Sequence, residues 1–150
     1  MLKNTKLLDC FEKIVKKYAK VECPVWLTTE TDTQYLNRFI FLNLVQLRAY
    51  WVFGKKSSTL SRLPSKTFPE FVLRVLLHEI SHLLEEERMG KNNYKISYAA
   101  SVSIYGHDSS TFELKADRFA NKEVKTIENK KRLFRLINKE YKRISKQSYI

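Results

Sequence analysis

The chain has 150 residues and a net charge of +12, with 28 Lys and Arg against 16 Asp and Glu. This length suits one domain, and a hydrophobic fraction of 43% excludes a disordered chain in spite of the charge. Two cysteines are too few for a disulfide framework, so we expect reduced thiols in a cytoplasmic protein. No apolar stretch is long enough for a signal peptide or a membrane span.

The first third of the chain predicts one helix followed by short strands. Residues 5 to 20 place apolar side chains at helical spacing and lysines on the other face, which indicates an amphipathic helix. Residues 25 to 28 are typical of a short strand. Residues 35 to 54 are rich in β-branched and aromatic side chains and predict two buried strands, although the period leaves a helix over 44 to 52 open. A polar loop should follow over 55 to 66.

The clearest helix begins after Thr67. Thr67 and Glu70 have the spacing of a capping box, Pro69 falls in the first turn, and Gly90 is a suitable C-terminal stop. The sequence between these ends is apolar on nearly every side, which places this helix in the middle of the domain. Residues 91 to 93 predict a polar turn.

The second half of the chain predicts one strand and two helices. Apolar and small polar residues alternate from 96 to 104, which is typical of a half-buried strand. Ser110 and Glu113 form a second capping box at the start of another helix. A basic helix should cover about 128 to 145. We therefore expect an α+β fold in one domain over residues 1–150, with a small mixed sheet against two central helices.

His78, Glu79 and His82 form an HExxH sequence within the central helix. Residues i and i+4 lie one turn apart on the same helix face, so both imidazoles can reach one metal ion. Neutral imidazoles suit Zn²⁺, and a catalytic zinc site has three protein ligands and one open position. Glu79 can contact a water at that position without being a ligand. The motif therefore predicts a catalytic zinc site with Glu79 as general base.

The next helix offers the third ligand. Glu113 and Asp117 lie at i and i+4 beside the small Ala116 and Ala120, which permit close approach to the HExxH helix. Glu113 can complete a His₂Glu site, or it can act only as the capping-box glutamate that reaches back to Ser110. Asp117 can accept a hydrogen bond from the second nitrogen of a metal-bound histidine, or it can pair with a nearby lysine.

Three further side chains have open roles. His107 is a competing third ligand, a catalytic proton donor or oxyanion stabiliser, or a loop residue without function. As a fourth ligand it would instead close a structural metal site. Tyr98 and Tyr105 can donate to a developing oxyanion, with core packing as the alternative for Tyr98.

HEISH at residues 78–82, followed by ELKADRFA at residues 113–120, resembles gluzincin-type zinc metalloproteases, and within these the small ImmA/IrrE metallopeptidases. The resemblance covers about Phe71 to Val124. It implies a minimal zincin-like domain, with zinc held by His78, His82 and Glu113, that cleaves a DNA-binding repressor. The chain departs from this group at Ser81, where Gly is usual, at Asp117, which is often Asn, and after residue 120, where a Leu-Met-Pro-like run is missing.

Residues 106–112 are similar to a GHxxxF-like segment of SprT/Wss1-like proteases, which act on proteins crosslinked to DNA. That likeness implies His107 as the third zinc ligand. The expected partners are a protein or peptide substrate, which the strand over 96–104 would receive by β-addition, and DNA or a DNA-bound protein on the basic C-terminal helix. A non-catalytic nucleic-acid-binding module is the remaining alternative.

Overall fold

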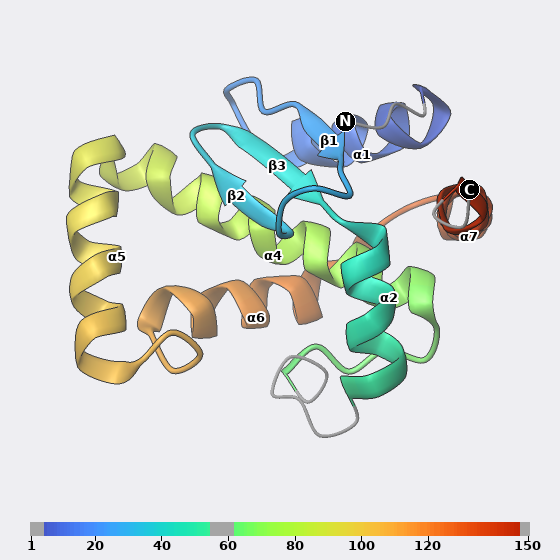
Figure 1. Ribbon diagram of the computed structural model, residues 1–150. Coiled ribbons are helices and arrows are strands. Elements are labelled where there is room, and N and C mark those ends of the chain that lie inside the picture. Colours follow the sequence, from blue (N-terminus) through green and yellow to red (C-terminus); the bar gives the residue numbers. More distant parts are fainter. Residues whose placement is uncertain (1–4, 55–61, 148–150) are drawn as a thin grey trace.

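The computed structural model describes residues 5–54 and 62–147, and their fold is mixed α+β and mostly helical (Figure 1). This class was predicted and is confirmed. Residues 55–61 of the expected polar loop lie outside the described residues. The elements in chain order are α1 (Thr5–Tyr18), β1 (Val25–Leu27), β2 (Gln34–Leu36), β3 (Phe39–Leu42), α2 (Leu44–Phe53), α4 (Phe68–Met89), α5 (Lys91–Tyr105), α6 (Thr111–Glu123), the short 3-10 helix η2 (Val124–Thr126) and α7 (Lys130–Gln147).

The sheet has the strand order β1-β3-β2, with β1 parallel and β2 antiparallel to β3. Asn37 and Arg38 connect β2 to β3 with φ of 49° and 65°, the left-handed conformation that suits a tight hairpin turn. Ile40 and Leu42 of β3 point into the core and are 0% exposed. β2 lies at an edge of the sheet, so one side of its backbone is free of strand pairing within the described residues.

The segment from 35 to 54 divides between two structures. Its first part forms strands, as expected, but its second part forms α2, the helix that the period had left open. Asn43 caps this helix, because its side chain accepts a hydrogen bond from the backbone N–H of Gln46 at 2.9 Å. Leu44 and Leu47 face the core, so one turn of α2 supplies the burial that a second long strand was expected to supply.

α4 occupies the centre of the molecule, between the sheet and α6 (Figure 1). The expected caps are present: the Thr67 side chain accepts from the backbone N–H of Glu70 at 3.3 Å, and Gly90 ends the helix with φ of 84°. Side chains from Phe71 to Leu83 are buried on nearly every turn. A helix covered on all sides can carry polar groups only where neighbouring elements satisfy them, so its two histidines require partners.

The strand predicted over 96 to 104 is wrong, because these residues belong to α5, and the turn predicted over 91 to 93 is its first turn. Two glycines with φ of 84° and 83°, Gly90 and Gly106, bound the helix. Tyr98 and Ser101 lie on the side that faces α4 and α6, whereas Ile96 and Ile104 are 69% and 71% exposed. The alternation that predicted a strand therefore does not separate buried from exposed residues.

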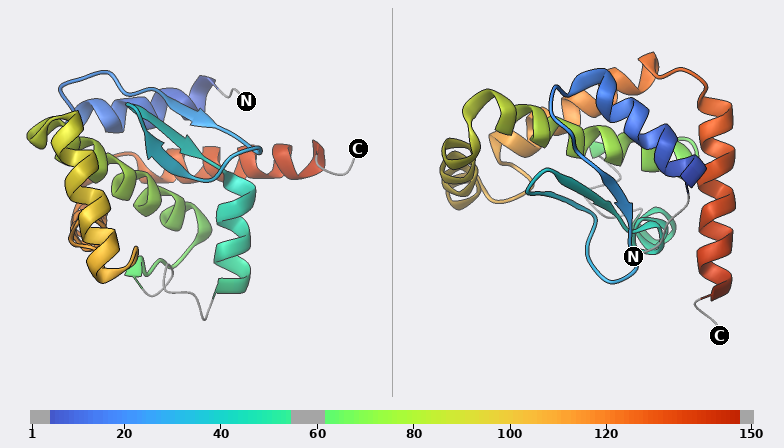
Figure 2. Two further views of the ribbon diagram at one scale, coloured as in Figure 1. Left: turned by 60° about the vertical axis from the view of Figure 1, so that its left-hand side comes forward. Right: turned by 90° about the horizontal axis from the view of Figure 1, so that it is seen from above.

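α7 stands at the edge of the molecule and packs against α1, α2 and α4 (Figure 2). It begins and ends two residues later than the helix expected over 128 to 145. α1 was predicted over 5 to 20 and ends at Tyr18. Cys10 and Cys23 form no disulfide, in agreement with the prediction of free thiols. Within the described residues, no helix combines the length and the apolar character needed to cross a bilayer.

Candidate metal centre

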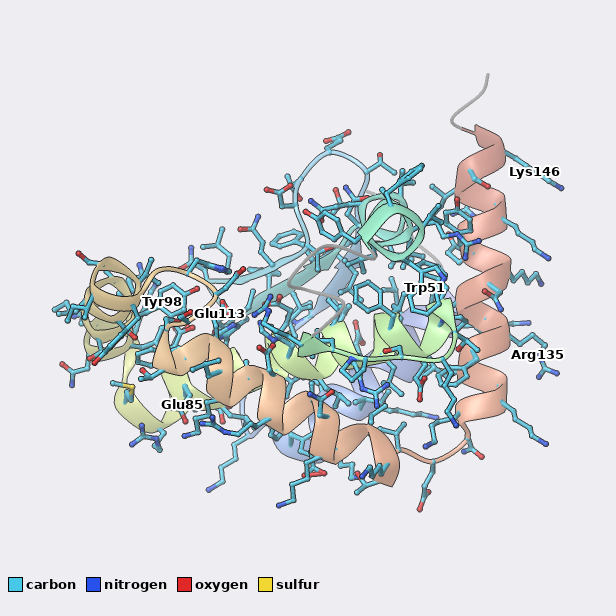
Figure 3. All side chains as sticks on the ribbon, turned by 90° about the horizontal axis from the view of Figure 1, so that it is seen from below. Trp51, Glu85, Tyr98, Glu113, Arg135 and Lys146 are labelled. Carbon is cyan, nitrogen blue, oxygen red and sulfur yellow. The ribbon has the colours of Figure 1, made fainter. Side chains whose placement is uncertain are left out.

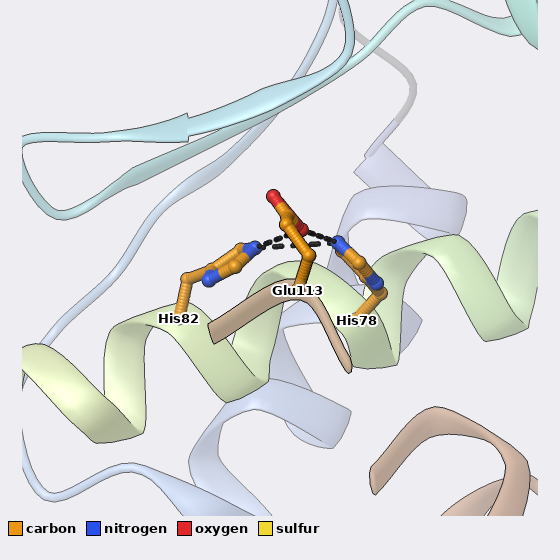
Figure 4. Close-up of side chains that lie close together, drawn as sticks. All are labelled: His78, His82 and Glu113. Atoms are coloured by element: carbon orange, nitrogen blue, oxygen red, sulfur yellow. Dashed lines mark hydrogen bonds and ion pairs between the residues drawn. The ribbon is translucent and has the colours of Figure 1, made fainter. Parts of the chain in front are cut away.

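α4 and α6 bring three side chains to one point inside the molecule (Figure 4). Nε2 of His78 and Nε2 of His82 lie 3.2 Å apart, since the two residues are one helical turn apart on α4. Oε2 of Glu113, from α6, lies 2.9 Å from the first nitrogen and 3.1 Å from the second. All three residues are buried, with exposed fractions of 8%, 5% and 3%. This buried group could hold a metal ion.

The cap at the start of α6 leaves the Glu113 side chain free for this group. Ser110 accepts a hydrogen bond from the backbone N–H of Glu113 at 3.2 Å, as the capping box predicts. The Glu113 carboxylate does not reach back to Ser110, whose own N–H donates to the carbonyl of His107 at 3.2 Å. Instead, Oε1 of Glu113 accepts a hydrogen bond from the Tyr98 hydroxyl at 2.8 Å. The Glu113 side chain therefore lies beside the two histidines and makes no contact with the backbone N–H of Ser110.

Asp117 fixes the ring of His78. Its Oδ1 lies 2.9 Å from Nδ1 of His78, which leaves Nε2 pointing toward Glu113. Oδ2 of Asp117 accepts from the Arg62 guanidinium at 3.1 Å. The expected contact between Asp117 and the second nitrogen of a histidine is therefore present. The interaction of Asp117 with Arg62 was not predicted from the sequence. Such a contact orients an imidazole and raises its basicity.

The charges around His78 favour a cation. Burial lowers the pKa of His78, but hydrogen bonds to Asp117 and Glu113 outweigh it and raise that pKa to about 10. The pKa of the Glu113 carboxyl lies well below its usual range, because both histidines interact with it more strongly than burial opposes ionisation. Two acidic side chains therefore contact one imidazole, and positive charge at Nε2 is stabilised whether a proton or a metal ion supplies it.

The donor set matches the chemistry of a metal such as Zn²⁺. Ligand atoms around a tetrahedral ion at about 2.0 Å are separated by about 3.3 Å. The three ligand atoms here are separated by 2.9 to 3.2 Å, close to that spacing. Nδ1 of His82 is buried without a hydrogen bond to any described residue, so this ring is positioned by its Nε2 contacts and by packing, including an edge contact with Tyr98 at 5.8 Å.

Glu79 lies beside the three ligand candidates without joining them. Its side chain is half-buried and lines a large cavity with a volume of about 530 Å³. No hydrogen bond or ion pair within the described residues engages its carboxylate. The cavity also reaches His78, His82 and Glu113. A carboxylate that is uncommitted and next to the candidate ligands is free to exchange a proton with a molecule in the cavity.

His107 approaches the site from its solvent side. Its side chain is 62% exposed, and its Nε2 lies 3.1 Å from Oε1 of Glu113, the oxygen that does not face the other histidines. Nδ1 lies 3.0 Å from Asp108, whose carboxylate is 3.8 Å from Arg62. His107 lies outside the buried group of three within the described residues. Its position at the mouth of the cavity fits a group that contacts a ligand entering from solvent.

The tyrosines divide between the site and the surface. The Tyr98 hydroxyl donates to Glu113, a contact that the sequence did not suggest. Tyr105 is 59% exposed and does not line the cavity. Tyr35 of β2 was missed: it lines the cavity and donates to Glu86 of α4 at 2.7 Å. Neither Tyr35 nor Arg62 lies in a recognisable motif, and only the fold brings them to α4 and α6.

Comparisons of the chain with protein families, with curated proteins and with solved structures found no match. The functional interpretation therefore depends on the residues of the site.

Proposed function

We propose that this protein is a zinc-dependent peptide hydrolase. The observation that carries the proposal is the convergence of His78, His82 and Glu113 on one buried point in a cavity that Glu79 also lines. Two imidazoles and one carboxylate form a catalytic type of zinc ligand set, with one position left for water or substrate. The HExxH arrangement adds a second carboxylate that is not a ligand, which is the element that a purely structural metal site does not need.

Each residue then has a defined part in the chemistry. A zinc ion at this site would supply the Lewis acidity that polarises a peptide carbonyl and lowers the pKa of an attacking water. The Glu79 carboxylate accepts the proton of that water and delivers it to the nitrogen of the leaving amine. His107, at the mouth of the cavity, is placed to donate to the carbonyl oxygen as negative charge develops on it. Asp117 and Tyr98 hold the ligands in position.

β2 supplies a surface for an extended substrate. Gln34, Tyr35 and Leu36 line the cavity, and β2 is an edge strand that has no strand partner on its outer side among the described residues. A peptide that adds to this edge gains main-chain hydrogen bonds, while its side chains enter the cavity. The expected wall over 96–104 is a helix and cannot pair in this way, so β2 takes that role in the proposal. A DNA-binding repressor remains the proposed protein substrate.

A Glu79→Gln variant tests the mechanism, because it removes the base and retains all three ligands. We expect zinc content equal to that of the unaltered protein and hydrolysis reduced by about 10²- to 10⁴-fold. Metal content is measured by atomic absorption, and hydrolysis by mass spectrometry of a degenerate peptide mixture in ¹⁸O-labelled water. Glu30→Gln, at an exposed acid outside the cavity, is the matched control and should leave both values unchanged.

Two results would contradict this proposal in different ways. Full hydrolysis by the Glu79→Gln variant would show that another group activates the water. Purification of the unaltered chain without zinc, together with failure to take up one zinc ion per chain, would show that the three residues are not a zinc site.

A further inference from the structure

Six exposed cations form one continuous strip on α7, which we call the α7 strip. Successive residues of an α-helix are rotated by about 100°, and the six side chains then span an arc of about 100° around the helix axis. Arg135 and Lys146 point away from the rest of the molecule (Figure 3). The strip consists of Lys131, Arg132, Arg135, Lys139, Lys142 and Lys146.

The opposite side of α7 packs against the rest of the fold. Leu133, Ile137 and Ile144 are buried, with exposed fractions of 3%, 0% and 2%. Glu140, the one acidic residue of α7, is 0% exposed and forms an ion pair with Arg143. No acidic residue of the same helix therefore neutralises the strip, and the partly buried apolar residues of α7 also pack against the core.

Cations of α1 continue the positive surface next to the first turn of α7. Lys13 and Lys17 line a cavity of about 320 Å³ together with Arg132 of the strip, and Glu128 is the one acidic residue in its lining. Lys17 also donates to the carbonyl of Thr126 at 3.3 Å. The positive surface is therefore concave at one end and straight along the rest of α7.

We propose that the α7 strip binds the phosphate backbone of duplex DNA without reading its sequence. From residue 131 to residue 146 a helix rises about 22 Å. A DNA strand has one phosphate per about 3.4 Å of duplex axis, so this length spans about six phosphates. Six cations on a rigid helix match that number. Lys and Arg on one helix face give backbone contacts, whereas sequence readout requires side chains that reach base edges.

The strip favours DNA over an anionic membrane surface. A helix that lies in a membrane interface inserts an apolar face, with its cations along the border. The apolar face of α7 is buried against α1, α2 and α4, so membrane contact would depend on charge alone. The strip is also separate from the candidate metal centre, because no described residue of α7 lines the large cavity. DNA binding and hydrolysis can therefore be tested independently.

The test measures binding of a fluorescein-labelled 24-base-pair duplex by anisotropy between 50 and 200 mM NaCl. The strip variant is Arg135→Gln, Lys139→Gln and Lys142→Gln, and the control variant is Lys20→Gln, Arg38→Gln and Lys91→Gln. Both variants remove three exposed charges from the +12 of the chain, so they differ only in where the charge is lost. Glutamine is a good helix former, so α7 should remain folded, and circular dichroism checks this.

For the unaltered chain we expect a slope of about −5 when log K is plotted against log [NaCl], because six phosphate contacts each contribute about −0.9. The strip variant should bind at least tenfold more weakly at 50 mM NaCl, with the slope reduced by about three, while the control variant changes less than twofold. Duplexes of two unrelated sequences should bind equally.

Three outcomes would overturn the proposal. Equal losses in the two variants would show an effect of total charge without a defined surface. Absence of duplex binding at 50 mM NaCl would exclude the strip as a DNA site. Binding to phosphatidylserine vesicles that depends on the strip, without duplex binding, would assign it to a membrane surface.

Discussion

At the scale of single residues, His78 is the most constrained side chain of the site. Asp117 lies 2.9 Å from one ring nitrogen and Glu113 lies 2.9 Å from the other, so both nitrogens face carboxylates. An imidazole between two carboxylates retains a proton unless a metal ion replaces it. Metal binding and proton release are therefore coupled at this residue.

We expect zinc binding at pH 8 to release about one proton from the protein. The pKa of His78 is raised to about 10 in the metal-free protein, so the ring is protonated at pH 8, whereas a ligand nitrogen must be neutral. Release should fall toward zero as the pH rises through about 10, because the proton is then already lost. Calorimetry in buffers of different ionisation enthalpy measures the number of protons, and a value near zero at pH 8 would contradict this picture.

The same pKa shift has a consequence for stability without metal. The folded-state pKa of His78 lies above its ordinary value of about 6.5, so protonation of this ring adds to the free energy of unfolding. This stabilisation is fully present below about pH 6.5 and is lost as the pH rises through about 10.

The sequence predicts the residues of the site that share a helix, and it misses those that reach it through the fold. His78, Glu79 and His82 follow from spacing on one helix. Glu113 and Asp117 follow from spacing on a second helix. Only the packing of α4 against α6 determines that the Glu113 carboxylate contacts His78 and not the backbone N–H of Ser110. Arg62 comes from a segment 55 residues before Asp117, and no local pattern marks it.

At the scale of secondary structure, α5 shows where a period can mislead. Residues 96 to 104 alternate between apolar and small polar side chains, yet Ile96 and Ile104 face solvent. The contacts that hold the segment are polar and aromatic: Tyr98 donates to Glu113, and Ser101 accepts from the N–H of Thr111 at 3.0 Å. Positions 98 and 101 are three apart, as on a helix face, but a sequence does not indicate which polar residues will be buried.

Proline substitutions test the helical assignment of α5. Ala100→Pro, in the middle of the helix, removes a backbone hydrogen bond and should lower the free energy of unfolding by about 3 kcal/mol. Lys91→Pro is the matched control, because position 91 is the first residue of α5 and follows Gly90, whose ψ of 151° suits a residue before proline. It should cost less than about 1 kcal/mol. Urea unfolding measures both values, and equal losses would place the helix boundary elsewhere.

At the scale of the whole molecule, the candidate metal centre joins segments that are distant in sequence. α4 supplies two ligand candidates and α6 the third, while α5 and Arg62 contact the acidic members from two further directions. An ion at this point would therefore connect several elements at once. Since the unfolded chain cannot assemble such a group, binding energy at the site adds to the stability of the whole fold.

Addition of zinc at 100 times its dissociation constant should therefore stabilise the protein by about 2.7 kcal/mol, which corresponds to a rise in Tm of about 5–10 °C. Scanning calorimetry with zinc and with EDTA measures the shift. Glu79→Gln should retain the full shift and His82→Ala should lose it, because only the second variant removes a ligand.

The same shift in Tm, measured for Glu113→Gln and His107→Ala, distinguishes the two candidates for the third ligand. Glu113 lies in the buried group and His107 is 62% exposed, so the shift should be reduced in the first variant and preserved in the second. The reverse pattern would identify His107 as the ligand. The role of Glu113 would then be limited to the hydrogen bond from its backbone N–H to Ser110 and the contact of its carboxylate with Tyr98.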